Sequence, residues 1–269
     1  MSHHFFDHGA ARLHEIVRPG MLCAFDFDGT LAPIVKDPHR ACIPSAVLRR
    51  LITLSERTPV AIISGRSVAD VSLRLDFLPE FVVGNHGIEG LPGWEENAGR
   101  LQALCLQWEH QLRQAMTGRT QFDGGIWIEN KNYSLSVHYR MVRDRVQAEE
   151  QLLKLFEGLN PAPHVVAGKC VFNLLPAGAP DKGSALARLC ELSRAPSAIY
   201  VGDDVTDEDV FRLRRPDWLT VRIERSGESE AEFHLHHRLD MVQLLDDLIE
   251  RLASLGCASA SPVPAAAAR

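Results

Sequence analysis

Two acidic motifs are the parts of this sequence best suited to chemistry. The first, DFDGT at residues 26–30, closes one short apolar run, and the second, GDDVTDE at residues 202–208, closes another. Like charges about 4 Å apart repel by about 4 kcal/mol at an effective dielectric near 20, so gathered carboxylates need a cation or a proton. We therefore expect the two motifs to meet in an oxygen-rich site for a hard divalent ion. Mg²⁺ fits better than Ca²⁺, because no loop has the EF-hand spacing.

Two further motifs suit a phosphoryl group. Ser64-Gly65 offers a hydroxyl and backbone N–H groups in a turn at a helix start, a natural cradle for phosphate. Lys182 opens a later helix and can place a point charge on the same anion. Each feature alone is common in loops, but their position at successive strand ends indicates one site. The carboxylates would supply the metal site and the nucleophile, and Ser64 and Lys182 would hold the phosphoryl oxygens.

The elements that must position these motifs alternate between strands and helices. Short apolar runs predict strands at residues 21–27, 59–63, 198–202 and 219–223. Helical spacing of apolar residues occupies residues 44–56, 67–75, 182–192, 207–214 and 240–255. This alternation predicts an α/β fold, with a parallel sheet whose strands are joined by helical crossovers.

The middle of the chain follows a different pattern. Residues 125–131 and 133–139 alternate on either side of Asn132, which predicts antiparallel pairing. By parity, one set of side chains is apolar and the other carries polar and charged groups, among them Glu129, Lys131, Ser136 and His138. We expect the apolar face to pack on helices at 101–116 and 148–159, and the polar face to meet solvent or a ligand. The α/β core is therefore interrupted by an α+β insertion.

The change of pattern sets the expected domain boundaries. A discontinuous core would comprise residues 1–95 and 178–257, and an inserted domain residues 96–177, sizes typical of domains. Residues 258–269, ASASPVPAAAAR, are of low complexity and are expected to be disordered. Four early histidines, His3, His4, His8 and His14, are expected to lie on a frayed, solvated terminus rather than to bind metal.

Composition excludes several classes of protein. The chain has 269 residues, of which 45% are hydrophobic, and its 35 acidic and 29 basic residues give a net charge of −6. Such a balance argues against a nucleic-acid partner. No stretch approaches the roughly 20 apolar residues that span a bilayer, and the start lacks the features of a signal peptide. The six cysteines include no CxxC pair. We expect a cytoplasmic protein without a membrane partner, and a monomer by default.

Taken in order, the motifs resemble those of the haloacid dehalogenase-like phosphatases: DFDGTL at 26–31, SGR at 64–66, DKG at 181–183 and GDDVTDE at 202–208. Finer features resemble the trehalose-6-phosphate phosphatase family within that group. These are Ala32-Pro33, NHGIE at 85–89, Glu129 and Lys131 ahead of HYR at 138–140, and Gly168-Lys169 before a strand. The resemblance spans roughly residues 21–250. It implies a Rossmann-like parallel-sheet core with an inserted cap, Mg²⁺ as the cofactor, and trehalose 6-phosphate as the substrate.

The resemblance also implies roles for the five aspartates. Asp26 would be the nucleophile, forming an aspartyl-phosphate, and a metal ligand. Asp28 would act first as general acid and then as base, while its backbone carbonyl binds the metal. Asp203 would ligate the metal, with Asp204 and Asp207 supporting that site.

The phosphate-binding residues follow from the same resemblance. Thr30, Ser64, Gly65 and Lys182 would stabilise the phosphoryl oxygens. Arg66 would either reach the substrate or pair with a nearby acid.

The cap would supply sugar specificity. The resemblance implies that Glu129 and Lys131 contact sugar hydroxyls, with a solvated sheet face as the alternative. The loop containing His86, Gly87 and Glu89 would form a wall between core and cap. Arg140 and Asn173 are two further candidates for sugar binding. For Arg140 the alternative is a structural pair with His138. The family pattern usually has Glu at the position of Asn173, and the change exchanges a charged acceptor for an amide with one acceptor and two donors.

Other functions remain open from sequence. Within phosphatases, the alternatives are sucrose-phosphate and mannosylphosphoglycerate types. A phosphosugar mutase would retain the phosphate on the sugar. A non-catalytic regulatory partner of a trehalose-phosphate synthase is a third class, disfavoured because Asp26, Asp28, Lys182 and Asp203 are all present.

Overall fold

A computed structural model describes residues 2–117 and 124–258. The larger of its two sheets has seven parallel strands in the order β1-β11-β10-β9-β2-β3-β4. The bounds of these strands are His3–His4 (β1), Leu22–Phe25 (β2), Val60–Ile63 (β3), Phe81–Val83 (β4), Ala198–Gly202 (β9), Trp218–Ile223 (β10) and Phe233–Leu235 (β11). The four strands predicted from sequence are confirmed, with ends that differ by three residues or fewer. Strands β1, β4 and β11 were not predicted, because each is only two or three residues long.

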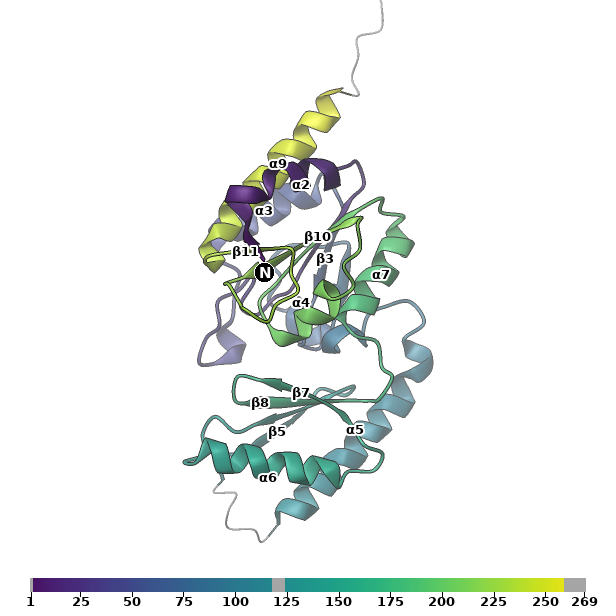
Figure 1. The fold of residues 1–269 in the computed structure, drawn as a ribbon. Coiled ribbons are helices and arrows are strands. Elements are labelled where there is room, and N and C mark those ends of the chain that lie inside the picture. The colour runs from purple at the N-terminus through teal and green to yellow at the C-terminus, as the bar shows by residue number, and fades with distance from the viewer. Residues whose placement is uncertain (1, 118–123, 259–269) are drawn as a thin grey trace, which may run out of the picture.

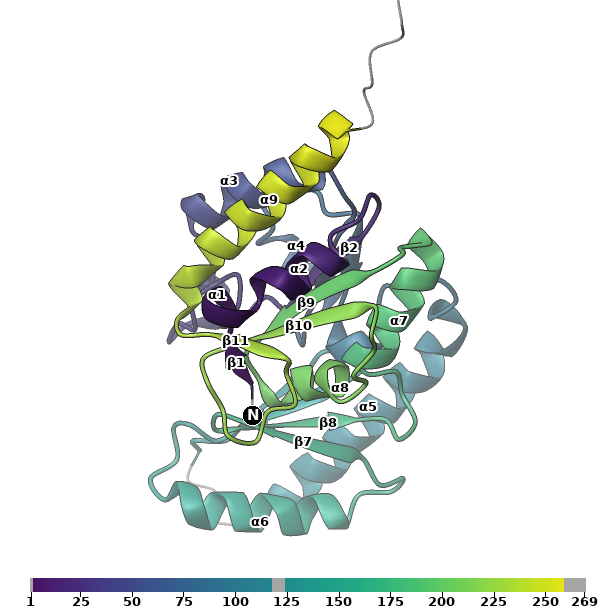
Figure 2. The ribbon, with the colours of Figure 1, turned by 45° about the horizontal axis from the view of Figure 1, so that its top comes forward.

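Helices cover both faces of this sheet. One face packs on α2 (Ala10–Ile16), α3 (Ser45–Ser55), α4 (Val68–Ser72) and α9 (Met241–Ala258). Figure 2 shows α3 and α9 side by side on this face. The other face packs on α7 (Lys182–Ser193) and α8 (Glu208–Phe211). The strands are buried on both faces, as a parallel sheet requires, which is why they appear in sequence as continuous apolar runs.

The second sheet is antiparallel, in the order β5-β6-β8-β7. Its strands are Trp127–Asn130 (β5), Leu135–His138 (β6), His164–Gly168 (β7) and Val171–Leu175 (β8). One face packs on α5 (Glu95–Met116) and α6 (Arg145–Glu157) through buried side chains such as Trp108, Leu152 and Phe172. Figure 1 shows this layer beneath the parallel sheet. The predicted α/β fold, with a parallel-sheet core and an inserted α+β unit, is confirmed.

The register of β5 and β6 confirms the predicted parity. Glu129 is opposite Ser136, and Trp127 is opposite His138, so the polar side chains share one face. Asn173 on β8 is opposite Ser136 and extends that face. We call Glu129, Lys131, Ser136 and Asn173 the polar cap face. It is turned toward the parallel sheet, since Lys131 contacts the loop after β3.

The expected frayed N-terminus is wrong. Strand β1 adds His3 and His4 to the edge of the large sheet beside β11, and α1 (Phe5–His8) follows directly. The physical reason is burial, because the Phe5 side chain is 2% exposed and packs against Phe233. Because Phe5 is anchored in this way, the preceding His3 and His4 lie in an ordered strand. The expected disordered tail begins at residue 258, and from 259 on it lies outside the described residues.

No helix among the described residues is both long and apolar enough to cross a bilayer.

Replacing Phe5 by alanine tests the docking of the N-terminus. Loss of a fully buried phenylalanine typically costs about 3–5 kcal/mol, and we expect about 3 kcal/mol here because the site is at the sheet edge. Phe6→Ala is the matched control, since the neighbouring ring is only partly buried, and should cost about 1 kcal/mol. Urea unfolding followed by circular dichroism gives both values. Equal and small losses would show that the terminus is not docked.

Candidate functional site

The predicted site residues meet at the carboxyl ends of three adjacent strands. Strands β9, β2 and β3 are neighbours in the sheet and run parallel. Asp203 follows β9, Asp26 follows β2 and Ser64 follows β3. Short apolar strands therefore deliver three motifs, far apart in sequence, to one edge, where ligands of open α/β sheets bind.

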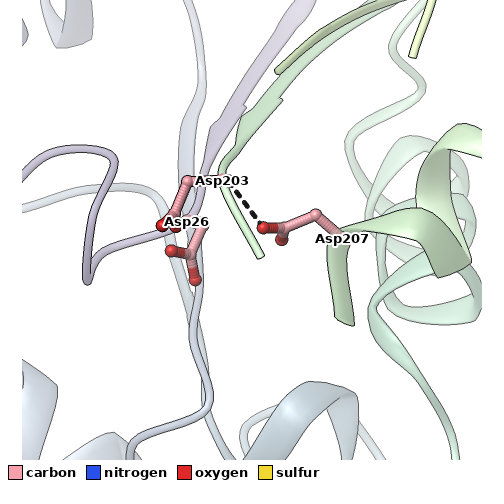
Figure 3. Close-up of side chains that lie close together, drawn as sticks. All are labelled: Asp26, Asp203 and Asp207. Carbon is pink, nitrogen blue, oxygen red and sulfur yellow. Dashed lines mark hydrogen bonds between the residues drawn. The ribbon is translucent and has the colours of Figure 1, made fainter. Parts of the chain in front are cut away.

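Asp26, Asp203 and Asp207 form a carboxylate cluster. One oxygen from each lies within 4.8 Å of the others, and Figure 3 shows Asp26 and Asp203 close together, with the Asp207 carboxylate pointing toward them from the side. Asp26 is 4% exposed and Asp207 is fully buried. Three acids so close together and so far from water repel strongly unless positive charge is present.

Lys182 supplies one positive charge to the cluster. Its Nζ donates to Asp26 Oδ1 and to Asp207 Oδ1, each at 2.7 Å, and the side chain is 2% exposed. The residue begins α7, after the N-cap Asp181 accepts a hydrogen bond from Ser184 N. Burial opposes the charge of Lys182, but Asp207 and Asp26 outweigh it, so its pKa is raised. The ammonium is therefore permanently charged and fixed in place.

Asp207 is saturated with hydrogen bonds. Its Oδ1 accepts from Lys182 and from the hydroxyl of Tyr200, and its Oδ2 accepts from the backbone N–H groups of Asp203 and Asp204. These bonds hold both Lys182 and the loop after β9. The geometry favours Asp207 as the support of the site rather than a direct metal ligand. Sequence reasoning missed Tyr200, because an aromatic residue within an apolar strand gives no sign that its hydroxyl faces an acid.

The cluster fits a divalent cation. Three carboxylates and the one ammonium leave a formal charge of −2, and carboxylate oxygens are ligands for hard ions. Burial raises the pKa of Asp203 to about 7, with further contributions from Asp207 and Asp204. Burial also raises the pKa of Asp26. Ionising these acids therefore costs free energy that a bound cation would recover. The Asp204 carboxylate is not part of the cluster.

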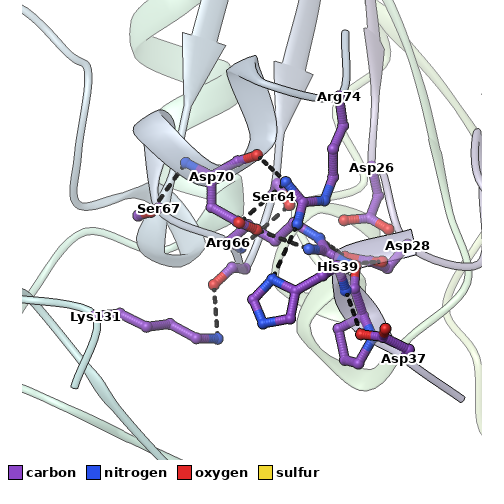
Figure 4. Close-up of polar contacts among 12 residues, drawn as sticks. Asp26, Asp28, Asp37, His39, Ser64, Arg66, Ser67, Asp70, Arg74 and Lys131 are labelled. Atoms are coloured by element: carbon purple, nitrogen blue, oxygen red, sulfur yellow. Dashed lines mark hydrogen bonds and ion pairs between the residues drawn. The ribbon is translucent and has the colours of Figure 1, made fainter. Parts of the chain in front are cut away.

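Asp28 is paired with Arg66. The guanidinium donates to both Asp28 oxygens, at 2.6 and 2.7 Å, and also to Asp70 and the carbonyl of Pro38. Figure 4 shows this network beside Asp26. Of the two alternatives for Arg66, pairing with a nearby acid is what the structure contains. The Asp28 side chain is 39% exposed and the Arg66 side chain 10%, so Asp28 is the more accessible member of the pair.

Of the predicted phosphate-binding residues, Thr30 lies after β2 and Ser64 and Gly65 lie after β3, at the same edge of the sheet as Asp26. Ser64 is 1% exposed, and its Oγ accepts from the backbone N–H of Arg66. Thr30 is buried, with its Oγ1 3.5 Å from Asp203 Oδ1. Gly65 lies against the His86 ring, and a Cβ there would come within 2.5 Å of that ring. The position therefore needs glycine.

The polar cap face reaches this loop directly. Lys131 Nζ donates to the carbonyl of Gly65 at 3.2 Å (Figure 4). Burial lowers the pKa of Lys131, with Arg66 adding to the effect. Glu129 pairs with His138 at 3.0 Å, and Asn173 Oδ1 accepts from Ser136 Oγ at 2.7 Å. The structure thus brings Glu129, Lys131 and Asn173 onto the cap face that is turned toward the loop after β3.

The NHGIE loop lies at the junction of core and cap. His86 has φ of 61° and is 8% exposed, and neither ring nitrogen has a hydrogen-bond partner within the part of the chain that the structure describes. Burial lowers its pKa, with Lys131 and Lys182 contributing, so the imidazole is neutral. Gly87 has φ of 117° and packs against the backbone of Asp181. Glu89 Oε2 accepts from Val68 N and from the Asn85 amide, so it fixes the loop.

Three contacts were not predicted or differ from expectation. Asn85 Oδ1 accepts from Ser134 Oγ of the cap at 2.7 Å, a bond between distant segments that no local pattern signals. Arg140 is exposed and donates to the carbonyl of Lys169. It is not paired with His138, whose partner is Glu129. The alternative of a His138–Arg140 pair is therefore wrong.

Comparison with known proteins places this geometry in a family. A model of the trehalose-phosphatase family matches residues 24–236. A trehalose-phosphate phosphatase of Mycobacterium tuberculosis (strain H37Rv) is 32% identical over 240 residues, covering 85% of this chain and 60% of that protein. The chain thus spans less than two thirds of that relative's length.

Solved structures show the same fold. Aspergillus fumigatus trehalose-6-phosphate phosphatase, crystal form 3, has a TM-score of 0.62 at 28% identity and covers 90% of this chain and 97% of its own. The C-terminal domain of the Candida albicans enzyme has a TM-score of 0.69 at 22% identity, covering 93% and 98%. With the family model matching most of its length, and with its carboxylate cluster at the strand ends beneath a polar cap face, the chain belongs to the trehalose-phosphatase family.

Proposed function

We propose that this protein is a Mg²⁺-dependent phosphatase that hydrolyses trehalose 6-phosphate to trehalose and inorganic phosphate. One observation carries the proposal: Asp26, held by Lys182, lies at the sheet edge toward which the polar cap face is turned, and Lys131 of that face contacts Gly65 in the loop after β3. A phosphoryl group and a polyol would both find partners in such a site. The family assignment supports the same reaction.

The metal would be held by Asp26 and Asp203, with the backbone carbonyl of Asp28 as a further ligand and with Asp204 and Asp207 in support. A bound Mg²⁺ supplies charge compensation for the carboxylates and for the phosphoryl oxygens. Asp207 would act through its hydrogen bonds, which orient Lys182 and the Asp203 loop.

Hydrolysis would proceed in two displacements. Lys182 holds Asp26 Oδ1, which leaves Oδ2 to attack phosphorus. As the new O–P bond forms, the bond from phosphorus to the sugar oxygen breaks, and Asp28 donates a proton to that oxygen. Water then attacks the aspartyl-phosphate, giving a proton back to Asp28, and inorganic phosphate leaves. To donate this proton, the Asp28 carboxyl would leave its hydrogen bonds with Arg66 and bond to the leaving oxygen. The charge on the phosphoryl group would be stabilised by Thr30, Ser64, Gly65, Arg66 and Lys182.

The polar cap face would select the sugar. Glu129 accepts and Lys131 donates hydrogen bonds to hydroxyls, and the loop of His86, Gly87 and Glu89 forms the wall opposite. The Asn173 Oδ1 already accepts a hydrogen bond from Ser136, so Asn173 would donate to a ligand through its amide N–H groups. Arg140 at the exposed rim would contribute to sugar binding only through the Lys169 turn. Because Asn173 donates where the family pattern has the charged acceptor Glu, a phosphatase for another sugar phosphate is the second candidate function.

We also propose a division into domains at the two sheets. The core would comprise residues 1–95 and 178–257, and the cap residues 96–177. The start of α5 at Glu95 and the gap between β8, ending at Leu175, and α7 support these boundaries. A cytoplasmic monomer remains the working proposal.

Phosphate release from a panel of sugar phosphates tests the activity. We expect turnover of trehalose 6-phosphate at least tenfold faster than of glucose 6-phosphate or sucrose 6-phosphate, because a second ring adds contacts to the polar cap face. EDTA should abolish turnover, and Mg²⁺ should restore it. Equal rates on all three sugars would refute the assigned substrate. A phosphorylated sugar product without free phosphate would indicate a mutase, and no turnover at all a regulatory partner.

Asp26→Asn tests the aspartyl-phosphate mechanism. The amide is nearly isosteric but lacks the nucleophilic oxygen charge, so we expect a loss of at least 1,000-fold in kcat with an unchanged circular dichroism spectrum. Asp76→Asn, an exposed aspartate outside the site, is the control and should retain full activity. A variant at Asp26 that still turns over rapidly would rule out covalent catalysis by this residue.

Asp203→Asn tests the metal site through stability. Because the folded pKa of Asp203 is raised to about 7 from 3.8, ionising it destabilises the metal-free protein as pH rises between these values. We therefore expect the variant to gain roughly 1–3 kcal/mol in unfolding free energy over the wild type at pH 8 in EDTA, and no gain near pH 4. It should also lose the stabilisation that Mg²⁺ gives the wild type.

Asp76→Asn provides the control for this experiment. It removes the same charge from an exposed residue outside the site, so Mg²⁺ should stabilise it as it does the wild type. Thermal unfolding with and without Mg²⁺ distinguishes the two variants. Identical behaviour of the two would mean that Asp203 is not a metal ligand.

A further inference from the structure

Asp70 pairs with Arg66, the partner of Asp28, but has no role in the reaction proposed above. Its Oδ2 accepts from Arg66 Nη1 at 2.7 Å. Asp28 accepts from Nε and Nη2 of the same guanidinium, at 2.6 and 2.7 Å. Figure 4 shows both carboxylates bonded to Arg66. One cation therefore serves two acids through different nitrogens.

Asp70 is held in place independently of Asp28. It lies in the first turn of α4, where its backbone N–H donates to Oγ of the N-cap Ser67 at 3.2 Å. Its Oδ1 is 3.0 Å from Arg74 Nη1, which also donates to the Asp70 carbonyl at 2.7 Å. The Arg74 side chain is 9% exposed, so this anchor is largely shielded from water. The position of the Asp70 carboxylate therefore does not depend on its bond to Arg66.

The Arg66 guanidinium needs an acid beside it at every stage of the reaction. Its side chain is 10% exposed, and its guanidinium carbon lies 5.5 Å from the centroid of the buried Phe27 ring. A buried cation that loses its partner is an uncompensated charge, which is strongly destabilising. Within residues 2–117 and 124–258, the ion pairs of Arg66 are those with Asp28 and Asp70. When Asp28 leaves for the sugar oxygen in the proposed reaction, Asp70 is the acid that stays with Arg66.

We propose that Asp70 is a positioning residue, which holds Arg66 while Asp28 turns to the leaving oxygen. The proposal rests on the proposed function, because it takes Asp28 as the general acid of that reaction. Asp70 acts through Arg66 and touches no reacting atom. By keeping one carboxylate on the guanidinium, it reduces the electrostatic cost of separating Asp28 from Arg66. It also keeps Arg66 in place for Asp28 to rejoin after the proton transfer.

Asp70→Asn tests this role. The amide is nearly the same size and can still accept a hydrogen bond, but it lacks the charge that balances Arg66. We expect kcat for trehalose 6-phosphate to fall about tenfold and KM to change less than about twofold, because the lost effect belongs to proton transfer and not to binding. Asp70→Glu keeps the carboxylate and should retain kcat within about threefold of the wild type. A rise in KM without a fall in kcat would overturn the proposal.

A second substrate identifies the affected step. With p-nitrophenyl phosphate, the phenolate that leaves is stable without a proton, so its departure does not need Asp28 as an acid. The ratio kcat/KM reports the steps up to loss of the leaving group, and for this substrate we expect Asp70→Asn to lower it less than about twofold. An equal loss with both substrates would overturn the positioning role.

Arg74→Gln is the matched control. It removes the other ion-pair partner of Asp70 and leaves the bond to Arg66, so kcat for trehalose 6-phosphate should stay within about twofold of the wild type. Circular dichroism and thermal unfolding show whether each variant is folded. If Arg74→Gln lost as much kcat as Asp70→Asn, Asp70 would act only by holding α4, and the proposal would be overturned. A wild-type protein that releases no phosphate from trehalose 6-phosphate would instead contradict the proposed function.

Discussion

The buried bond of Lys182 to Asp26 and Asp207 is the contact on which the rest of this site depends. A 2% exposed ammonium between two carboxylates at 2.7 Å is stable only while all three groups remain in place, because removing one leaves an uncompensated buried charge. That constraint joins the end of β2, the start of α7 and the loop after β9. The one positive charge of Lys182 against three carboxylates leaves a formal charge of −2, which a divalent ion would neutralise.

A second set of bonds ties this centre to the cap. Asn85 occupies a left-handed conformation and is completely buried, with its amide shared between Glu89 of the core and Ser134 of the cap. Its backbone N–H donates to the carbonyl of Arg66, so the residue also holds the loop after β3. One residue, Asn85, thus links the cap to the loop after β3. In the proposed function, Lys131 would bind the sugar and Ser64 the phosphoryl group, and this residue would connect the two.

Local patterns in the sequence predicted the parts of the molecule that depend on local rules. Strand ends, the switch from helical spacing to alternation, and the parity that places Glu129 with Ser136 all follow from neighbours along the chain. What escaped prediction depends on contacts between distant segments. Docking of Phe5 beside Phe233, the Tyr200 bond to Asp207 and the Asn85–Ser134 bond each join residues whose proximity only the fold creates. The pairing of Arg66 with Asp28 was predicted only in part. The sequence offered an ion pair with a nearby acid as one of two roles for Arg66, but it gave no means of choosing between them.

The distribution of charge explains how an acidic chain is compatible with the phosphorylated substrate proposed for it. The net charge of −6 describes the whole molecule, whereas a ligand experiences the local field. At the site, buried acids are placed where a divalent ion neutralises them, and the cations stand where phosphoryl oxygens would lie. Lys182 and Arg66 are already paired with acids, so each must exchange or share a partner when phosphate arrives. In the proposed reaction, these paired cations would change partners only when a metal ion compensates the acids that they leave.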